Sequence, residues 1–381
     1  MKITFLSNYF NHHQAAFCYA MYKRLGESFC FIQTEEMEAE RLQMGWGTEE
    51  EPAFLKKTYG SSLAEAECKA IIDDADVVII GSAPECLIKK RIQNGKLVIR
   101  YSERQLKKGL EVWKYPYRYI KWHLKNPKCA DIHLLCASAY AASDYAKFGL
   151  FKDKCYKWGY FPEVKEYSDI GRLIELKRPA SILWVARLIE WKHPELPILV
   201  AKRLKEDGYA FEMNLIGNGI LEEKLREMIS EYSVGDCVKM LGTMKPEQVR
   251  EHMERSQVFM FTSDRNEGWG AVLNEAMNSG CAVVASHAVG ATPFLIHDNE
   301  NGLVYQDGDT EELYLKVKLL LDDQRKAAQL GKKAYETMIG EWNAECAAER
   351  LLLLLDDLKT NGFSNRFSKG PCSRAEIIPV P

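Results

Sequence analysis

Two glutamates eight positions apart, Glu267 and Glu275, stand in the segment RNEGWGAVLNEAMNSG (265–280), with two glycines and a tryptophan between them. The segment follows VFMFTS and precedes CAVVAS, two apolar stretches of strand length. A strand, a glycine-bearing turn, a short helix and a second strand make up one unit of a parallel α/β sheet. Ligands bind such sheets at the carboxyl ends of the strands, so we expect a binding site at Glu267 and Gly268.

The residue types of this segment suit a sugar and a phosphate. An ionised carboxylate only accepts hydrogen bonds, which matches the hydroxyls of a sugar. Glu275 lies about one turn into the expected helix, where the dipole favours a negative side chain. Gly268 and Gly270 leave the backbone bare, so that amides at the helix start can approach an anion. We interpret the spacing as one glutamate for a transferred sugar and one for a ribose, with a diphosphate between them. The alternative is a solvated helix start with ordinary acidic residues.

Further candidates end other strands of the second half. Arg187 closes the stretch SILWVAR and is followed five residues later by Lys192, and two such cations can neutralise a diphosphate. They can also be a surface pair. Gly217 and Gly219 lie in a strand-to-helix turn, where a packing role is the alternative to a phosphate contact. Gly242 ends another strand, where exposed backbone can contact a nucleotide base.

Short apolar stretches separated by helical patterns run through both halves of the chain, which predicts parallel sheets covered on both faces. The expected strands are 2–7, 28–33, 76–81, 96–101, 132–137, 154–159, 181–187, 211–217, 238–242, 258–263, 281–286 and 302–306. A polar segment with two prolines separates the halves, and two such domains create a cleft at their strand ends. We expect an N-terminal domain (1–160), a linker (161–178), a C-terminal domain (179–340), a closing helix (341–358) and a disordered tail (359–381).

Composition excludes several classes of protein. A formal net charge of −3 gives no pull toward nucleic acid, and no apolar run is long enough for a membrane span. The 11 cysteines include no CxxC pair, which favours reduced thiols, and no signal peptide precedes the first strand, so we expect a cytoplasmic protein. The DAD triplet (74–76) precedes its strand instead of following it, so no metal is implied. Hydrolase, P-loop and dinucleotide motifs are absent from the sequence.

The order and spacing of these residues resemble the nucleotide-binding domain of the retaining glycosyltransferases of family four, which have the GT-B fold. EGWGAVLNEA (267–276) matches that family's E-G-[FW]-G-x-x-x-x-E-A pattern closely. The segment 341–355 resembles its closing helices, which cross back onto the first domain. Two positions depart from the pattern: Ala186 replaces a glycine before the arginine, and Phe294 replaces an acidic residue.

The resemblance implies a role for each side chain of the motif. Arg187 and Lys192 would hold the donor diphosphate, Glu275 would accept from the ribose and Glu267 would contact the transferred sugar.

The resemblance also implies backbone contacts with the nucleotide sugar. The turns at Gly217, Gly219 and Gly242 would contribute to the nucleotide site. The segment from Gly268 through Trp269 to Gly270 would touch the sugar or phosphate.

The N-terminal half departs further from the family. Asn11, His12 and His13 replace a glycine-rich loop after the first strand, where they can donate to the diphosphate or the acceptor, or can be structural. Glu103 stands where the family often has a histidine near the donor sugar. It can act as a base toward the acceptor hydroxyl, or can simply begin a helix.

The expected activity is transfer of a hexose or N-acetylhexosamine from a nucleoside-diphosphate sugar, with UDP favoured, to an acceptor hydroxyl with retained configuration. The acceptor would be a saccharide or a lipid-linked sugar of surface polysaccharide assembly, and no metal or cofactor would be needed. The alternatives are a GT-B nucleotide-sugar epimerase and a catalytically silent sugar-nucleotide-binding partner. Phosphorylases of this fold need a pyridoxal lysine on a much longer chain.

One basic segment, residues 100–128, suggests contact with a membrane. It holds nine Lys and Arg against two Glu, interleaved with tryptophan and tyrosine. Such a mixture suits the headgroup layer of an anionic membrane. The alternative is a solvated helix whose rings pack inward. We therefore predict peripheral attachment through residues 100–128, and no binding of nucleic acid.

Overall fold

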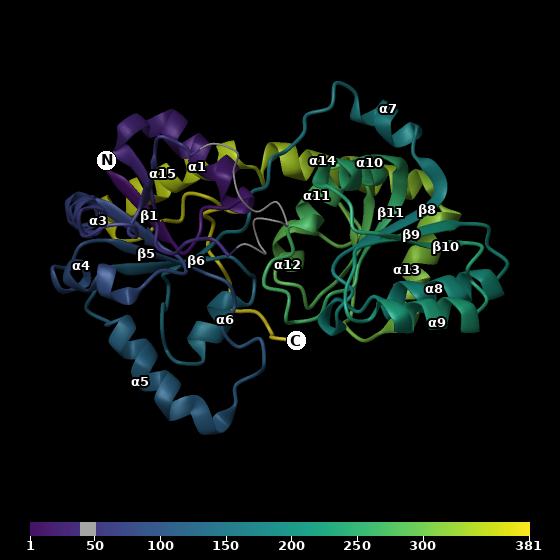
Figure 1. The fold of residues 1–381 in the computed structure, drawn as a ribbon, viewed down its shortest axis with the longest axis horizontal. Helices are drawn as coiled ribbons and strands as arrows, with labels where there is room; N and C mark the ends of the chain where they lie inside the picture. The colour runs from purple at the N-terminus through teal and green to yellow at the C-terminus, as the bar shows by residue number, and fades with distance from the viewer. Residues whose placement is uncertain (39–50) are drawn as a thin grey trace. The chain divides into compact units, whose positions relative to one another are not determined.

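The computed structural model describes residues 1–38 and 51–381. The chain divides into two compact units (Figure 1). The first unit comprises Met1–Glu163 and Asn343–Pro379, and the second comprises Val164–Trp342 and Val380–Pro381. The first unit is therefore built from both ends of the chain.

The first unit is organised around a seven-stranded parallel sheet with the order β3-β2-β1-β4-β5-β6-β7. Its strands are β1 (Ile3–Ser7), β2 (Phe29–Gln33), β3 (Leu55–Lys57), β4 (Val77–Ile80), β5 (Val98–Ser102), β6 (Ile132–Cys136) and β7 (Cys155–Lys157). Its helices are α1 (His12–Leu25), α3 (Ser62–Asp74), α4 (Lys89–Gln93), α5 (Tyr115–Lys125), α6 (Ala141–Ala146) and α15 (Ala344–Asn361). Six of these strands match predicted ones. The edge strand β3 was not predicted, because its three residues, LKK, carry no hydrophobic pattern.

The second unit contains a six-stranded parallel sheet with the order β10-β9-β8-β11-β12-β13. Its strands are β8 (Arg178–Val185), β9 (Glu212–Ile216), β10 (Val238–Gly242), β11 (Ser256–Phe261), β12 (Ala282–Ser286) and β13 (Leu303–Tyr305). Its helices are α7 (Ile170–Glu175), α8 (Glu195–Glu206), α9 (Glu222–Glu231), α10 (Pro246–Arg255), α11 (Val272–Asn278), α12 (Thr292–Leu295), α13 (Thr310–Asp322) and α14 (Gln324–Gly340). Helices α8, α9 and α13 cover one face of the sheet and α10, α11 and α14 the other (Figure 1), as continuous apolar strands predict.

Two expectations about connecting segments differ from the structure. The expected linker 161–178 joins the second unit from Val164 onward, because Lys165 N–H donates to Asn278 Oδ1 at 2.8 Å. The expected disordered tail instead pairs with strand β7, where Lys157 N–H donates to the Ser373 carbonyl at 2.7 Å. An edge strand offers unpaired backbone groups, so even a polar tail can be ordered by pairing with it.

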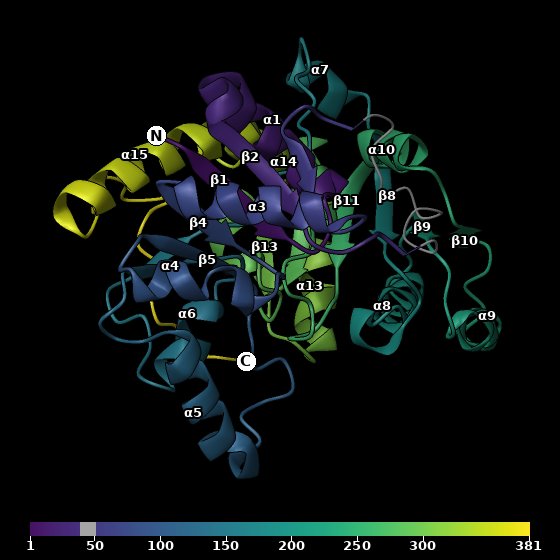
Figure 2. The same cartoon turned by 60° about the vertical axis from the view of Figure 1, so that its left-hand side comes forward.

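Helix α15 returns the chain to the first unit, where it packs against α1. Asn343 caps its first turn, and Glu345 pairs with Lys23 and Arg24 of α1. Its buried face is lined by leucines and alanines at helical spacing. Figure 2 shows α15 lying beside α1 and β1.

Helix α5 stands away from the sheet of the first unit (Figures 1 and 2). Its inner side is fixed by Tyr115, which stacks on Phe148 at 4.8 Å, and by Trp122, which packs on Phe148 at 4.5 Å. Its outer side carries exposed apolar residues, among them Trp113 just before the helix and Leu124, which are 77% and 76% exposed. Within residues 1–38 and 51–381, the helices are all too short or too polar to cross a membrane.

Candidate functional site

The loop that carries Arg187 follows β8 and is held against the loop after β9. The Leu188 N–H donates to a carbonyl of that neighbouring loop at 2.8 Å. The backbones approach so closely that a Cβ on Gly217 would lie 1.8 Å from the Ala186 carbonyl oxygen. A Cβ on Gly219 would lie 2.4 Å from the carbonyl oxygen of Leu188. These two glycines therefore have a packing role, through which they position the loop of Arg187.

Arg187 itself is exposed, and its guanidinium lies 5.7 Å from the centre of the Trp191 ring. Among the described residues, no hydrogen bond or ion pair engages this guanidinium. Its N–H donors are therefore available to an anion at the end of β8.

Lys192 and Glu267 form an ion pair through Nζ and Oε2, with side chains only 12% and 15% exposed. Both follow strand ends, Lys192 after β8 and Glu267 after β11. The Thr262 hydroxyl donates to the Lys192 carbonyl at 2.7 Å and accepts from the buried Trp184 indole at 2.8 Å. The structure thus brings together two residues, 75 positions apart, that the sequence placed at one site.

Asp264 connects the two segments that carry this pair. Its N–H donates to the Trp191 carbonyl at 2.9 Å, and its own carbonyl accepts from the Glu267 N–H at 3.0 Å. Its carboxylate lies 3.6 Å from His193 Nε2, while His193 Nδ1 lies 2.8 Å from Glu195 Oε1. The hydrogen bonds to Asp264 and Glu195 raise the pKa of His193 to about 10. His193 is therefore a cation at neutral pH that links the loop of Lys192 to the turn of Glu267.

The glycine-bearing turn after β11 is tightly packed. Gly270 has a φ of 88°, and a Cβ there would lie 2.3 Å from the ring of Phe261. The Trp269 side chain is fully buried, donates to Asn274 Oδ1 at 2.9 Å and packs on Trp342 at 5.9 Å between ring centroids. The Trp269 side chain therefore stabilises the turn from within, and the expected contact of residues 268–270 with a ligand stays a prediction about their backbone.

Glu275 lies in α11 with its side chain largely buried. Burial raises the pKa of its carboxyl, and the nearby Arg250 offsets this only in part. No hydrogen bond from the described residues reaches the carboxylate. A carboxylate that no protein donor engages is open to a ligand, so this side chain suits one that supplies hydroxyl protons.

The remaining predicted glycines of the second unit, Gly242 and Gly268, can offer a ligand only their backbone groups. Gly242 ends β10 with a φ of 71°, and its carbonyl accepts from the Gly217 N–H at 2.8 Å. Gly268 is buried beside Trp269.

In the first unit, the candidates after β1 have separate positions. The Asn11 side chain caps α1 by accepting from the His13 N–H at 3.0 Å, and His12 is exposed. The His13 ring stacks on Tyr160 at 5.3 Å. Burial, with a smaller contribution from His12, lowers the pKa of His13 to about 3, so that this ring carries no charge at neutral pH.

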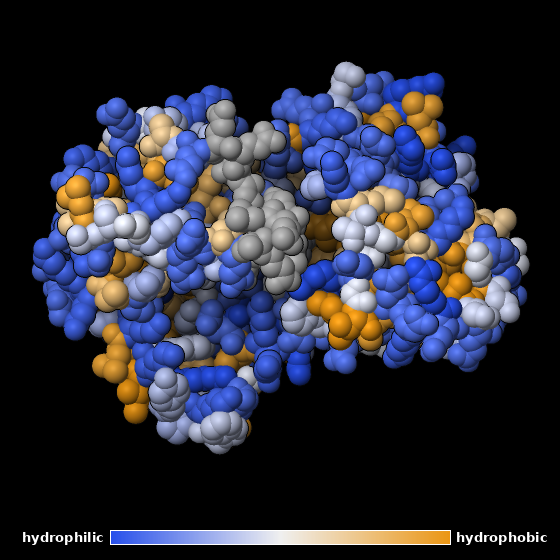
Figure 3. Space-filling model, in the orientation of Figure 1, coloured by the Kyte–Doolittle hydropathy of each residue, from blue (hydrophilic) through white to orange (hydrophobic). Residues whose placement is uncertain are grey.

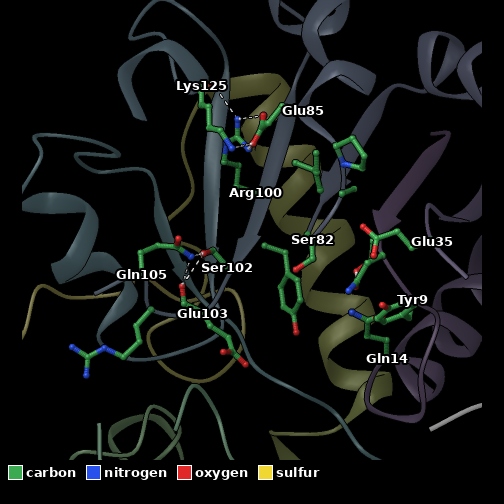
Figure 4. A pocket seen from close by; sticks show the side chains of 18 of the residues that line it. Tyr9, Gln14, Glu35, Ser82, Glu85, Arg100, Ser102, Glu103, Gln105 and Lys125 are labelled. Atoms are coloured by element: carbon green, nitrogen blue, oxygen red, sulfur yellow. Dashed lines mark hydrogen bonds and ion pairs between the residues drawn. The ribbon is translucent and has the colours of Figure 1, made fainter. Parts of the chain in front are cut away.

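Glu103 follows β5 and lines a pocket of about 880 Å³ in the first unit (Figure 4). Its Oε1 accepts from the Tyr160 hydroxyl at 2.5 Å, and its Oε2 lies 2.7 Å from Lys107 Nζ. Tyr160 thus joins His13 to Glu103. Both carboxylate oxygens of Glu103 are thus engaged, and this arrangement favours hydrogen bonding by Glu103 over proton abstraction.

The opposite part of the pocket wall contains a charged cluster. The Arg100 guanidinium binds both carboxylate oxygens of Glu85, at 2.9 and 3.0 Å, and Lys125 Nζ lies 3.1 Å from the same carboxylate (Figure 4). Burial raises the pKa of Glu85, but the hydrogen bonds from Arg100 and Lys125 outweigh it and hold the net pKa below its usual value.

Sequence reasoning missed Asp264, His193 and Tyr160. The first two flank Lys192 and Glu267 in the chain, and a carboxylate and an imidazole so close to a candidate site were the available signal. Tyr160 was assigned to the domain boundary, and no sequence pattern connects it with Glu103.

The DAD triplet has a structural role. Asp74 pairs with Lys2 Nζ at 2.6 Å, and Asp76 accepts from the Lys2 N–H at 2.8 Å, so both bind the start of β1. The described ranges contain no group of three or more His, Cys, Asp or Glu side chains placed to hold a metal ion.

Comparison with known proteins identifies the domain that contains the Lys192–Glu267 pair. Residues 171–337 match the family model of the glycosyl transferases group 1. This segment is similar to the members of that family. The amylovoran biosynthesis glycosyltransferase AmsK of Erwinia amylovora is 31% identical over 188 residues, which are 48% of this chain and 46% of the relative. The putative colanic acid biosynthesis glycosyltransferase WcaL of Escherichia coli is 30% identical over 186 residues, 47% of this chain and 46% of the relative. The match thus spans about half the length of these relatives.

The fold of the whole chain is that of known GT-B proteins. HepE of Anabaena, solved in complex with UDP, superimposes with a TM-score of 0.70 at 16% identity, covering 94% of this chain and 100% of that one. The predicted fold class, two Rossmann-like parallel-sheet domains, is confirmed.

Proposed function

We propose that the protein is a glycosyltransferase that moves a hexose or N-acetylhexosamine from a nucleoside-diphosphate sugar to an acceptor hydroxyl. The observation that carries this proposal is the largely buried Lys192–Glu267 pair at the strand ends of a glycosyl transferases group 1 domain. In this proposal the pair supplies a fixed cation for a phosphate and a hydrogen-bond acceptor for a sugar.

The proposed reaction depends on stabilising the negative charge of the leaving diphosphate. As the bond from the anomeric carbon to the diphosphate breaks, negative charge builds up on the phosphate oxygens. Lys192 and the unengaged guanidinium of Arg187 stabilise that charge, together with backbone amides near residues 268–270. Because Lys192 is already held by Glu267 and Thr262, little reorganisation is needed at that moment. These cations take the part that a metal would play, so we propose that neither a metal nor a cofactor is needed.

We propose that configuration is retained. The acceptor hydroxyl then forms its bond on the face from which the diphosphate departs, and its proton passes to the leaving phosphate oxygen. Glu267 accepts hydrogen bonds from the transferred sugar in this scheme. Glu103 accepts from the acceptor but does not take its proton.

UDP is the proposed nucleotide, with Glu275 accepting from the ribose hydroxyls. The Glu275 carboxylate, which no hydrogen bond from the described residues engages, supports the ribose contact. The UDP found in the Anabaena protein supports the choice of base.

The proposed acceptor is a lipid-linked sugar of surface polysaccharide assembly, reached from the cytoplasmic face of the membrane. Both relatives described above are named for the biosynthesis of such polymers. The outer side of α5 supports membrane contact: Val112, Trp113, Tyr117, Ile120 and Leu124 are all exposed. Figure 3 shows hydrophobic side chains along the outer left edge of this helix, beside hydrophilic ones.

The basic residues of α5 and of the segments beside it favour an anionic surface. Lys121 and Lys128 are exposed beside the apolar residues, whereas Lys114 and Arg118 pair with Glu111. Two aromatic rings of this helix, those of Tyr115 and Trp122, pack inward against Phe148, as the alternative to membrane contact predicts. An outer face with both large apolar side chains and exposed cations suits the headgroup layer.

An assay of UDP release tests the activity. The protein is incubated with several UDP-sugars and a lipid-linked acceptor, in excess EDTA, and the product anomer is assigned by NMR coupling constants. We expect acceptor-dependent UDP release and a retained anomer. An epimerase would convert the UDP-sugar without releasing UDP, and a silent partner would bind UDP without turnover. Failure of both UDP and GDP to raise the thermal midpoint at millimolar concentration would refute the donor site.

A further inference from the structure

Two neighbouring cavities lie in the first unit where strands β6 and β7 begin. The smaller one, next to the end of α5, has a volume of about 290 Å³, and the larger one has about 560 Å³. Residues 149–152, in the loop between α6 and β7, line both of them. The two cavities therefore share one wall.

The smaller cavity is basic. Three lysines line it and no carboxylate does, the lysines being Lys128, Lys152 and Lys154. Within residues 1–38 and 51–381, no ion pair engages any of the three. Much of the remaining wall is apolar, formed by Pro127, Ala130, Ile132, Leu150 and Phe151. Several ammonium groups around a small cavity suit a phosphate group.

The larger cavity is closed by the C-terminal segment, which passes beside α6 (Figures 1 and 2). The Ser143 hydroxyl of α6 donates to the Ile378 carbonyl at 2.8 Å and accepts from the Ile378 N–H at 2.9 Å. Most of the uncharged wall is apolar, formed by Ala142, Ala146, Leu150, Phe151, Ala375 and Ile377. Such a wall suits a hydrocarbon chain.

The charges divide between the two cavities in the same way. The larger cavity has as many carboxylates as cations in its wall, its charged residues being Lys152, Asp153, Arg374 and Glu376. The excess of positive charge therefore lies in the smaller cavity. Asp131 follows that wall in the chain, but His133 Nε2 lies 3.0 Å from its carboxylate. Even with Asp131 counted, cations outnumber carboxylates around the two cavities.

The wall between the cavities is fixed. Phe151 has a φ of 55°, in the left-handed region that a bulky side chain rarely adopts. Its ring packs on Tyr145 at 5.1 Å between centroids, and its carbonyl accepts from the Lys154 N–H at 2.9 Å. Strained backbone of this kind is found mainly at ligand sites. The two cavities are therefore preformed features of the loop.

We propose that the two cavities bind one anionic phospholipid, with its phosphate at the lysines of the smaller cavity and a hydrocarbon chain in the larger one. The inference goes beyond the proposed function, in which only the outer side of α5 contacts a membrane. Asn126 directly follows α5 and lines the smaller cavity. A lipid bound there lies at the end of the helix whose exposed side suits the headgroup layer.

Short-chain phospholipids that stay monomeric test this site apart from any membrane surface. The full chain is titrated by calorimetry with dihexanoylphosphatidylglycerol below its micelle concentration, with dihexanoylphosphatidylcholine and with glycerol 1-phosphate. We expect one phosphatidylglycerol to bind per chain, about tenfold or more tightly than either other compound. Phosphatidylcholine brings its own cation to the lysines, and glycerol 1-phosphate lacks the chain.

Two variants separate the phosphate from the chain. Lys128→Ala with Lys152→Ala should weaken binding of phosphatidylglycerol about tenfold, because two charge-assisted contacts are lost. Lys56→Ala with Lys89→Ala is the matched control, since both are exposed lysines of the first unit outside the two cavities. Ala146→Phe fills the larger cavity and should weaken binding of the lipid but not of glycerol 1-phosphate. The thermal midpoint of each variant checks its fold.

Four results would overturn the inference. They are no binding of phosphatidylglycerol at millimolar concentration, equal affinity for phosphatidylcholine, equal losses in the two lysine pairs, and equally tight binding of glycerol 1-phosphate, which would indicate a site for free phosphate esters.

A variant of α5 separates this site from the proposed membrane contact. Ile120→Ser with Leu124→Ser should leave binding of the monomeric lipid unchanged, because both residues lie outside the two cavities. Loss of binding in that variant would contradict a site at the cavities. Failure of the lipid site leaves the proposed transfer intact as long as UDP still raises the thermal midpoint.

Discussion

The Lys192–Glu267 ion pair matters both for the stability of the fold and for catalysis. Two charged side chains with little exposure are stable together, but each becomes an uncompensated charge when the other is removed. The same fixed geometry is what transition-state stabilisation needs. We therefore expect changes at this pair to affect both folding and catalysis, and the ratio of the two effects to be informative.

Lys192→Ala should reduce kcat/KM by about 2–4 kcal/mol of transition-state stabilisation, as expected for a preorganised electrostatic group. The measurement is UDP release under steady-state conditions. Lys202→Ala is the control, because Lys202 is an exposed lysine of α8 that lies 3.9 Å from Glu206. Equal, small effects of both substitutions would show that Lys192 acts only in the structure.

Glu275→Gln should stabilise the free protein at neutral pH and weaken UDP binding. Burial raises the pKa of Glu275, so the folded state holds the proton more firmly than the unfolded state. A group with a raised carboxyl pKa imposes a cost that appears as pH rises above its unfolded value of about 4.5. The variant's thermal midpoint should therefore exceed that of the natural protein at pH 7, and the difference should vanish near pH 4. A lower midpoint at pH 7 would contradict the burial argument.

The sequence predicted which residues belong to the candidate site, but not which of them are in contact. Glu267, Glu275, Arg187 and Lys192 were found because carboxylates, glycines and cations follow apolar strands. That Lys192 pairs with Glu267 could not be found, because the two are joined only through the pairing of β8 with β11. For the same reason the packing of the Trp269 ring could not be predicted: a sequence does not show on which side of a turn a ring packs.

The turns that connect strands and helices contain glycines with different structural roles. Gly217 allows two backbones to touch, whereas Gly242 has a positive φ of 71° with open space around it. Gly217→Ala should therefore lower the free energy of unfolding by about 3 kcal/mol or more, combining strain and overpacking. Gly242→Ala should cost only about 1–2 kcal/mol of backbone strain. Denaturant unfolding measures both, and equal costs would contradict the close approach at Gly217.

The inner side of helix α5 packs against the first unit and its outer side is exposed. The role of the outer side can therefore be tested without disturbing the packing. Ile120→Ser with Leu124→Ser should leave the thermal midpoint unchanged, because both side chains are exposed. The pair should reduce co-sedimentation with anionic liposomes, as should Lys121→Glu at low salt. Ile220→Ser is the control, an equally exposed apolar residue of the second unit. Unchanged sedimentation of all variants would exclude attachment through α5.

For the molecule as a whole, the sequence predicted the sheets well because parallel strands buried on both faces are nearly continuous apolar runs. The twelve expected strands all occur. The tail was expected to be disordered because it has no hydrophobic periodicity. In the structure it is ordered by backbone hydrogen bonds to β7 and by burial of Cys372.

Removal of residues 371–381 should destabilise the first unit. The deletion takes away the hydrogen bonds between the tail and Lys157 and the buried Cys372 side chain, and it exposes an edge strand. We expect a lower thermal midpoint and faster hydrogen exchange at the β7 amides, with exchange in β8 to β13 unchanged. A uniform rise in exchange over both sheets would instead indicate a single cooperative fold.

The return of α15 to the first unit has a consequence for how the protein is made. The second unit is almost entirely one continuous stretch, Val164–Trp342, so nearly all of it has left the ribosome before α15 is synthesised. The first unit is begun first, yet it lacks α15 and the segment that pairs with β7 until residues 344–375 have been synthesised. A nascent chain therefore carries an N-terminal sheet with an uncovered α1 while the later domain is already able to fold, the reverse of the usual N-terminal-first order.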